Sequence, residues 1–153
     1  MNILFIGPYR QNDEWGRKSR DMLHTLKQSD NKITARPIFL SNNLDYIEYE
    51  EISEHTTSDS YDVVIQFLLQ PFATYVGGAK NIGIFNYDTI PSDVPVSFLT
   101  KESLMDEIWT ESLSVKKSLE NLFNKYNINT NVIHIPPAID ISTLPDKDLF
   151  FII

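Results

Sequence analysis

Short runs of consecutive apolar residues recur along the chain, and they limit the fold more than any other feature. A strand with one face in water alternates apolar and polar residues, whereas here the apolar residues often stand side by side. Such strands are typical of a parallel sheet that helices cover on both faces. The predicted strands are 2–6, 62–67, 81–85, 107–109 and 131–135, with a weaker run at 33–39. Pro37 interrupts that weaker run, which suits an edge strand.

The segments between these runs have the period of amphipathic helices. One buried stripe would form from residues 19, 22, 23 and 26, and another from residues 115, 119, 122, 123 and 126. We also expect a short helix from Pro71 to Gly77 and a second one in the polar, acidic stretch 40–60. Alternating strands and helices predict an α/β fold, namely a Rossmann-like, doubly wound, mainly parallel sheet with helices on both faces.

The composition narrows the class of protein. The chain has 153 residues, of which 42% are hydrophobic, and this fits one globular domain. It has no cysteine, and its three histidines lack metal-site spacing, so we expect neither disulfides nor a bound metal. A net charge of −8 argues against nucleic acid as a partner. No apolar run reaches the roughly 20 residues of a membrane-spanning helix, so we expect no integral membrane segment and a cytoplasmic location.

The last residues suggest a domain boundary. Residues 1–145 account for one Rossmann-like domain, and a polar turn follows. Residues 149–153 are apolar and predict a strand, which either joins the same sheet or begins another domain. We favour the second alternative, with 146–153 as the linker and first strand of an absent domain. Asp146-Lys147-Asp148 spells the DxD pattern of some metal-dependent transferases, but its place in a linker favours a solvated turn.

In open α/β sheets, ligands bind at the carboxyl ends of the strands, so the loop after the first strand is a candidate site. This loop leads from Gly7 to Gly16, and Arg17 and Lys18 then stand in the first turn of a predicted helix. Cations there oppose the helix dipole unless an anion such as phosphate lies nearby. Alternatively, these cations are solvated and Gly16 is a turn residue.

A second candidate follows the strand at 81–85. Asp88 comes directly after Tyr87, just beyond a buried strand. Its carboxylate could bind sugar hydroxyls or take part in proton transfer. The alternative is an aspartate that caps the following turn.

Three segments resemble, in this order, the family-4 glycosyltransferases of the GT-B fold. They are Tyr87-Asp88-Thr89-Ile90-Pro91, the stretch from Met105 to Ser112 (MDEIWTES), and 132–140 (VIHIPPAID). The resemblance implies a domain that binds a sugar or glycan acceptor, beside a second Rossmann-like domain that binds a nucleotide-diphosphate sugar. It also implies retaining sugar transfer without an essential metal or other cofactor. One half alone should be inactive, because groups from both domains stabilise the leaving diphosphate.

The resemblance also suggests roles for residues of this chain. Those expected near the donor phosphates and the acceptor are Tyr9, Arg10, Trp15, Gly16, Arg17 and Tyr87, with Asp88 as the catalytic carboxylate. Asp106, Glu107 and Trp109 would support the sheet and the edge of the cleft. Two other functions stay open. One is a non-catalytic module that binds a glycan or phosphate, or completes a partner's site. The other is an unrelated nucleotide-binding α/β protein, which the lack of a GxGxxG motif disfavours.

Overall fold

The computed structural model describes residues 1–40, 45, 47–50, 52–54, 60–85, 87 and 90–136. Several predictions concern other residues. Asp88, the Asp146-Lys147-Asp148 segment and the strand at 149–153 lie outside the described residues. The domain boundary placed after residue 145 therefore stays a prediction.

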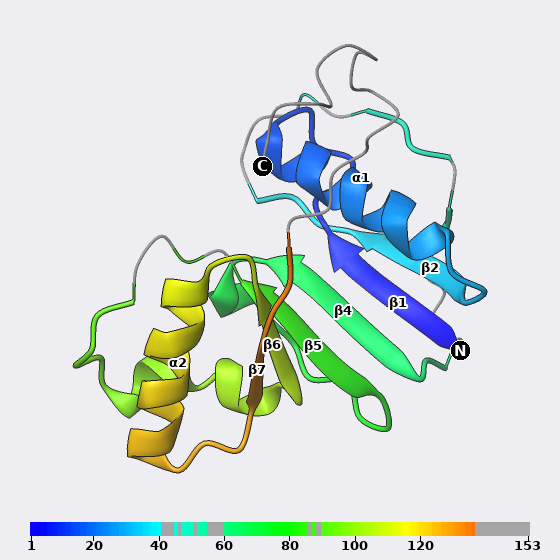
Figure 1. Cartoon of the computed structure of the whole chain (residues 1–153). Helices are drawn as coiled ribbons and strands as arrows, with labels where there is room; N and C mark the ends of the chain where they lie inside the picture. Colours follow the sequence, from blue (N-terminus) through cyan, green and yellow to red (C-terminus); the bar gives the residue numbers. More distant parts are fainter. Residues whose placement is uncertain are drawn as a thin grey trace, which may run out of the picture.

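The described residues form one seven-stranded sheet in which every neighbouring pair is parallel (Figure 1). The strands are β1 (Asn2–Gly7), β2 (Lys32–Pro37), β3 (Ser53–Glu54), β4 (Val63–Leu68), β5 (Lys80–Phe85), β6 (Glu107–Thr110) and β7 (Asn131–His134). Their order across the sheet is β3-β2-β1-β4-β5-β6-β7. This order confirms the predicted Rossmann-like α/β fold.

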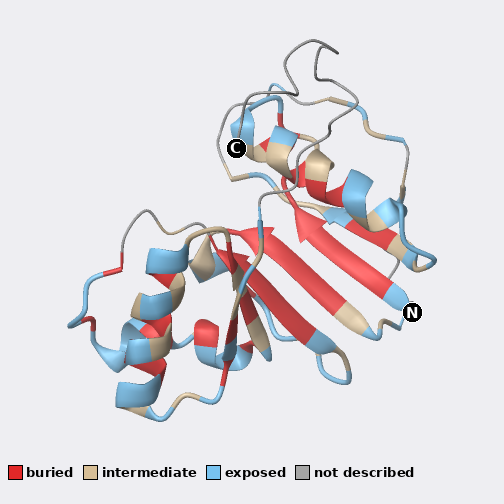
Figure 2. Cartoon of the chain, viewed as in Figure 1, coloured by how far each residue is buried: buried red, intermediate tan, exposed pale blue. Residues whose placement is uncertain are grey.

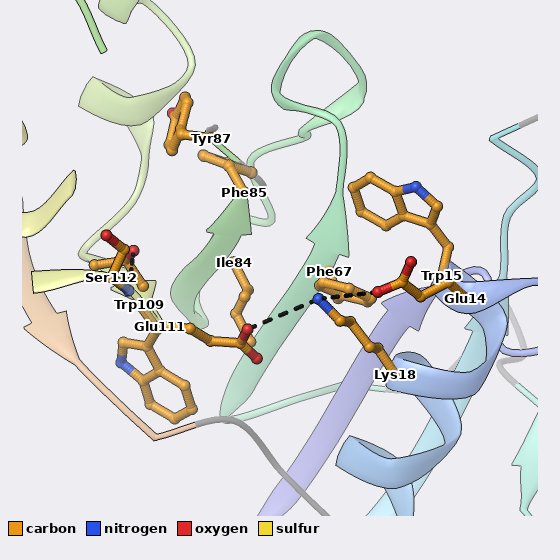
Figure 3. A pocket seen from close by; sticks show the side chains of 11 residues that line it. Glu14, Trp15, Lys18, Phe67, Ile84, Phe85, Tyr87, Trp109, Glu111 and Ser112 are labelled. Carbon is orange, nitrogen blue, oxygen red and sulfur yellow. Dashed lines mark hydrogen bonds and ion pairs between the residues drawn. The ribbon is translucent and has the colours of Figure 1, made fainter. Parts of the chain in front are cut away.

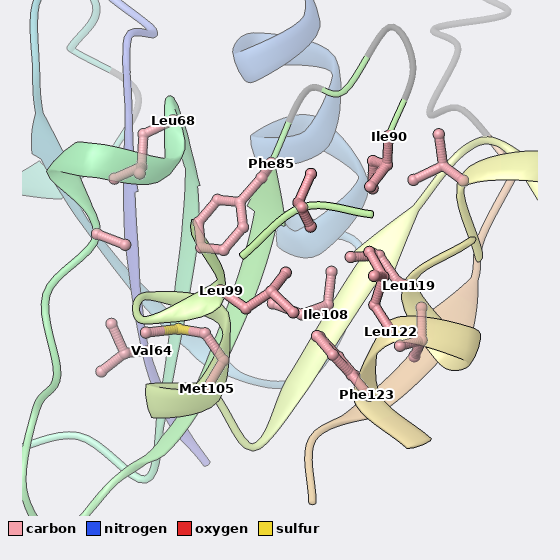
Figure 4. Packing of buried hydrophobic residues seen from close by; sticks show 14 of the residues in the cluster. Val64, Leu68, Phe85, Ile90, Leu99, Met105, Ile108, Leu119, Leu122 and Phe123 are labelled. Atoms are coloured by element: carbon pink, nitrogen blue, oxygen red, sulfur yellow. The ribbon is translucent and has the colours of Figure 1, made fainter. Parts of the chain in front are cut away.

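Helices cover both faces of this sheet. They are α1 (Glu14–Lys27) and α2 (Leu113–Tyr126), with short 3₁₀ segments η1 (Gln70–Phe72), η2 (Val96–Leu99) and η3 (Glu102–Leu104). Alternate residues of the same strands enter two apolar clusters, as expected for strands buried on both sides. Figure 2 shows the central strands of the sheet as largely buried. Met22 and Leu23 of α1 belong to one cluster. Leu119 and Leu122 of α2 belong to the other (Figure 4), so the two helices pack on opposite faces.

The connection between β4 and β5 differs from the prediction. The helix expected from Pro71 to Gly77 is wrong, because only η1 forms there. Two fully buried amides explain the difference. The Gln66 side chain bonds both the N–H and the C=O of Thr74, at 3.0 and 2.7 Å. Asn81 does the same for Val76, at 2.9 and 3.0 Å. These backbone groups are thereby satisfied without helical hydrogen bonds.

The other corrections concern the edge next to β2. Within the described part of 40–60 there is no helix, and Ser53–Glu54 instead form β3. β2 is therefore not the edge strand. Its pairing with β3 covers only Thr34 and Ala35. Pro37 lies beyond this β2–β3 ladder, so its missing N–H removes no hydrogen bond from the pairing with β3.

The strand order places a crevice near the start of α1. From β1 the chain first builds outward through β2 and β3, then returns to pair β4 on the other side of β1. At such a reversal, the connections after the two central strands diverge and leave room for a ligand at the carboxyl ends. No described helix is both long and apolar enough to cross a membrane.

Candidate functional site

A pocket of about 230 Å³ lies at the carboxyl ends of β4, β5 and β6, beside the first turns of α1 (Figure 3). Its lining is Glu14, Trp15 and Lys18 from α1, Phe67 from β4, Ile84 and Phe85 from β5, Tyr87, Trp109 and Thr110 from β6, and Glu111 and Ser112. The pocket therefore occupies the edge of the sheet at which the topology predicts a ligand.

Aromatic rings form much of the pocket wall. Trp15 packs on Phe67 with ring centroids 5.2 Å apart, and Phe85 meets Tyr87 edge-on at 6.2 Å. Trp109 completes the set, so both tryptophans of the chain line this pocket. Rings held against one another in this way offer rigid, flat surfaces to a ligand.

Three charged side chains stand between these walls. Lys18 Nζ lies 3.7 Å from Glu14 Oε1 and 3.9 Å from Glu111 Oε2 (Figure 3). The Lys18 and Glu111 side chains are about one-third exposed, at 35% and 31%. The ammonium group thus links the first turn of α1 to the segment after β6, across the pocket.

Trp109 is held in place by a carboxylate of its own strand. Its Nε1–H donates to Glu107 Oε2 at 2.9 Å, while Lys80 Nζ donates to Glu107 Oε1 at 2.5 Å. Burial would raise the pKa of Glu107, but these two hydrogen bonds and the Lys80 charge hold the pKa below its usual value. Asp106, just before β6, accepts a hydrogen bond from the Asn81 N–H at 2.7 Å.

Tyr87 is fixed from behind by a fully buried carboxyl group. Its hydroxyl donates to Glu102 Oε1, and Gln70 Nε2 donates to Glu102 Oε2 at 2.9 Å. Burial, and then the Glu102 charge, raises the pKa of Tyr87 far above its usual value. Tyr87 therefore remains a neutral phenol over the physiological range. Sequence reasoning missed Glu102, because nothing in its neighbourhood distinguishes it from a surface glutamate.

Tyr9 and Arg10 lie in a different place from the one predicted for a ligand site. Tyr9 is buried and its hydroxyl donates to Glu54 Oε1 at 3.4 Å, while Arg10 Nη2 lies 2.5 Å from the same oxygen. Burial, followed by the Glu54 charge, raises the pKa of Tyr9 above its usual range. Both side chains therefore anchor β3, and neither lines the pocket.

Gly16 and Arg17 likewise contact the protein itself. The Gly16 N–H donates to Asp13 Oδ1 at 2.8 Å, where Asp13 is the N-cap of α1. Arg17 Nη1 pairs with Asp21 Oδ2 at 3.2 Å on the helix surface. Of the predicted substrate-binding residues, the structure thus brings Trp15 and Tyr87 together in the pocket, and it does not bring Tyr9, Arg10, Gly16 or Arg17 there.

The pocket also contains residues that the sequence analysis did not assign to a ligand. Glu111 directly follows β6, so the signal that singled out Asp88, a carboxylate just past a buried strand, applies equally to it. Glu14 and Lys18 are one turn apart on α1 and thus share a face, which helical period alone could have indicated. Among the described residues, no group of three or more His, Asp or Glu side chains is placed to hold a metal ion.

Comparisons of the chain with protein-family models, with curated proteins and with solved structures gave no match in any of the three. The chemistry of the pocket is therefore the basis for a function.

Proposed function

We propose that the chain is the acceptor-side domain of a retaining glycosyltransferase with a GT-B architecture, and that the pocket holds the acceptor sugar. The supporting observation is the lining of the pocket, where Trp15, Tyr87 and Trp109 share one cavity with charged groups. The Rossmann-like fold is the one that the resemblance to family-4 glycosyltransferases leads us to expect.

This lining suits a sugar. A sugar ring has apolar C–H groups on its faces and hydroxyl groups around its rim. Aromatic rings can stack on the faces, while carboxylates accept hydrogen bonds from the hydroxyls and an ammonium group donates to them. At about 230 Å³ the pocket is smaller than typical sites for drug-sized ligands, which span about 300–1,000 Å³. One sugar unit therefore fits the space better than a complete nucleotide sugar.

In this proposal, the chain supplies only part of the reaction. The nucleotide-diphosphate sugar binds a second Rossmann-like domain, and the transfer takes place where the two domains meet. Asp88 keeps its predicted role as a carboxylate at the acceptor, since it follows Tyr87 in the chain. The reaction needs no metal or other cofactor, and the protein works in the cytoplasm. The isolated chain is expected to bind an acceptor without turnover.

The two tryptophans make binding directly measurable. Because both line the pocket, a ligand bound there should change the tryptophan emission. We expect saturable fluorescence changes with simple sugars and disaccharides, and no sugar transfer or nucleotide-sugar hydrolysis by residues 1–153. Robust turnover by this chain would contradict the two-domain proposal, and a flat titration with every sugar would contradict the acceptor pocket.

A matched pair of variants shows whether the pocket is the binding site. Trp15→Ala removes one wall and should weaken sugar binding about tenfold or more, since loss of a buried aromatic contact typically costs over 1 kcal/mol. Phe72→Ala is the control, because Phe72 is 61% exposed and lies outside the pocket. Binding is followed by tryptophan emission, which comes from Trp109 alone in Trp15→Ala and from both tryptophans in Phe72→Ala. Equal affinities in the two variants would place the sugar elsewhere.

A non-catalytic glycan-binding module is the second candidate, because every wall of the pocket comes from this one domain. Such a module would bind sugar as tightly alone as in the full protein. A second α/β domain with paired glutamates, encoded after Ile153, would favour the transferase. Stable association with another subunit, measured by sedimentation, would favour the module.

A further inference from the structure

The charges in the pocket are unequal. Glu14 and Glu111 contribute two carboxylates, and among the described lining residues Lys18 is the only basic side chain. A ligand that enters this space therefore meets an excess of negative charge.

These charged groups are only loosely paired. The distances from Lys18 Nζ to Glu14 and Glu111, 3.7 and 3.9 Å, exceed the roughly 2.7–3.2 Å of a hydrogen bond. Within the described residues, Lys18 is the only recorded partner of the Glu111 carboxylate. Glu111 consequently has acceptor positions free for a ligand, and a donor that reaches them need not break a short hydrogen bond.

The neutral polar groups nearby already make hydrogen bonds within the protein. Thr110 Oγ1 accepts from the Ser112 N–H at 3.2 Å, and Ser112 Oγ accepts from the Val115 N–H at 3.3 Å. Trp109 Nε1–H is bonded to Glu107. The carboxylates of Glu14 and Glu111 carry a negative charge, so they are stronger acceptors for a donor group of a ligand than these hydroxyls are.

The aromatic walls favour the same kind of ligand. The faces of Trp, Tyr and Phe rings carry partial negative charge and attract cations within about 6 Å. Trp15, Tyr87 and Trp109 surround a space that already contains free carboxylate oxygens. Stacking and charge thus act together on a sugar that carries an ammonium group.

From this arrangement we infer that the pocket selects an amino sugar, and that the Glu111 carboxylate binds its ammonium group. The inference rests on the proposed function, because it takes the pocket as the acceptor site. The inference also implies that the donor phosphates bind away from this end of α1. The cap of α1 is occupied by Asp13, and Glu14 stands in the first turn, so an anion at this helix end would meet two carboxylates.

The test compares three related sugars that differ in charge: glucosamine is cationic, glucose is neutral and glucuronate is anionic. Titrations at about pH 6, below the pKa of a simple amine, keep the glucosamine ammonium charged. From the strength of partly exposed ion pairs, we expect glucosamine to bind about three- to tenfold more tightly than glucose, and glucuronate to bind most weakly. Added salt should shrink the difference, because exposed charges are screened. Tryptophan emission is the readout.

Two charge variants with a matched control assign the effect to Glu111. Glu111→Gln should bring glucosamine and glucose to within about twofold of each other. Lys18→Gln should widen the preference, because it removes the cation that pairs with Glu111. Glu120→Gln makes the same change in net charge, but Glu120 pairs with Lys116 on α2, outside the pocket. This control should leave the preference unchanged.

The outcomes separate the two proposals. Equal binding of the three sugars, or equal effects of Glu111→Gln and Glu120→Gln, would overturn the choice of an amino sugar and leave the acceptor pocket standing. Tighter binding of glucuronate would also overturn it. If none of the three sugars changes the emission, the acceptor pocket itself is wrong, and the inference fails with it.

Discussion

At Gly16 the missing side chain makes room for the backbone of the preceding loop. A Cβ added there would lie 1.8 Å from Gln11 O and 2.9 Å from Arg20 Nη1. Arg20 holds the same loop by donating to Tyr9 O and Gln11 O, at 2.8 and 2.9 Å. The loop after β1 is thus folded tightly over the first turn of α1, which sets the position of Trp15 in the pocket. A ligand contact at Gly16 stays a prediction.

Gly16→Ala should destabilise the protein by about 2 kcal/mol or more, since the new methyl group overlaps a backbone atom that cannot move freely. This is against the trend for helices, where alanine is favoured over glycine by about 1 kcal/mol. Urea unfolding measures the change.

Gly77→Ala is the matched control, because no atom lies within 4 Å of a Cβ at that position. Its stability should stay within about 1 kcal/mol of the original, or rise slightly. If both alanine variants unfold at the same urea concentration, the close approach at Gly16 is not important for stability.

Among the elements, the connection from β4 to β5 shows how side chains can replace regular secondary structure. Asn81 Oδ1 accepts from the Val76 N–H, and its Nδ2 donates to Val76 O and Ala79 O, at 2.9, 3.0 and 2.9 Å. The second residue of β5 thereby holds the irregular segment that precedes the strand. The periodicity of apolar residues in the sequence does not predict such a hydrogen bond.

Asn81→Ala should therefore cost about 2–4 kcal/mol, because it leaves three backbone groups without partners. Hydrogen exchange of the Val76 amide should become faster at the same time. Asn131→Ala is the control: Asn131 starts β7 and is exposed, so its change should stay within about 0.5 kcal/mol. Unchanged protection of Val76 in Asn81→Ala would show that the amide is not its partner in solution.

Over the whole molecule, each face of the sheet contains a tyrosine beside a glutamate, and Tyr9 is buried while Tyr87 is partly buried. Tyr9 with Glu54 belongs to the cluster under α1, and Tyr87 with Glu102 packs against the cluster under α2. In both cases the folded state raises the pKa of the phenol above its ordinary value of 10.0. The protonation of the Tyr9 and Tyr87 phenols is consequently coupled to folding.

The free energy of unfolding should fall as the pH rises above about 10. There the unfolded chain releases phenol protons that the folded chain retains, so the unfolded state binds fewer protons. Each tyrosine contributes a slope of up to about 1.4 kcal/mol per pH unit. Tyr87→Phe and Tyr9→Phe should each flatten the decline, measured by urea unfolding between pH 9 and 11.

Tyr75→Phe, at an exposed tyrosine, serves as the control for this series. It should reproduce the decline of the original protein. A decline of the same steepness in all three phenylalanine variants would show that neither buried phenol couples to folding.

Much of the fold could be predicted because it depends on local patterns. Consecutive apolar residues at 2–6 and 81–85 indicated strands buried on both faces, and the helical period around Leu119 indicated α2. The predictions failed where a distant partner decided the local structure. Gln66 and Asn81 hold residues 74 and 76 in a non-helical segment, and β2 provides the ladder that makes Ser53–Glu54 a strand.

For the site, the sequence by itself indicated the edge of the sheet, since the carboxyl ends of parallel strands meet at one edge whatever else the chain does. Trp15 and Tyr87, which the resemblance suggested, line the pocket at this edge, and a ligand contact at either residue stays a prediction. Only the tertiary structure decided which charges share the pocket. Lys18 and Glu111 are 93 positions apart, and they meet because α1 and the end of β6 converge over β4 and β5. It likewise turned Tyr9 and Arg10 toward Glu54. The strand order brings such residues together, and it depends on contacts between residues far apart in the chain. Short-range sequence patterns do not encode these contacts.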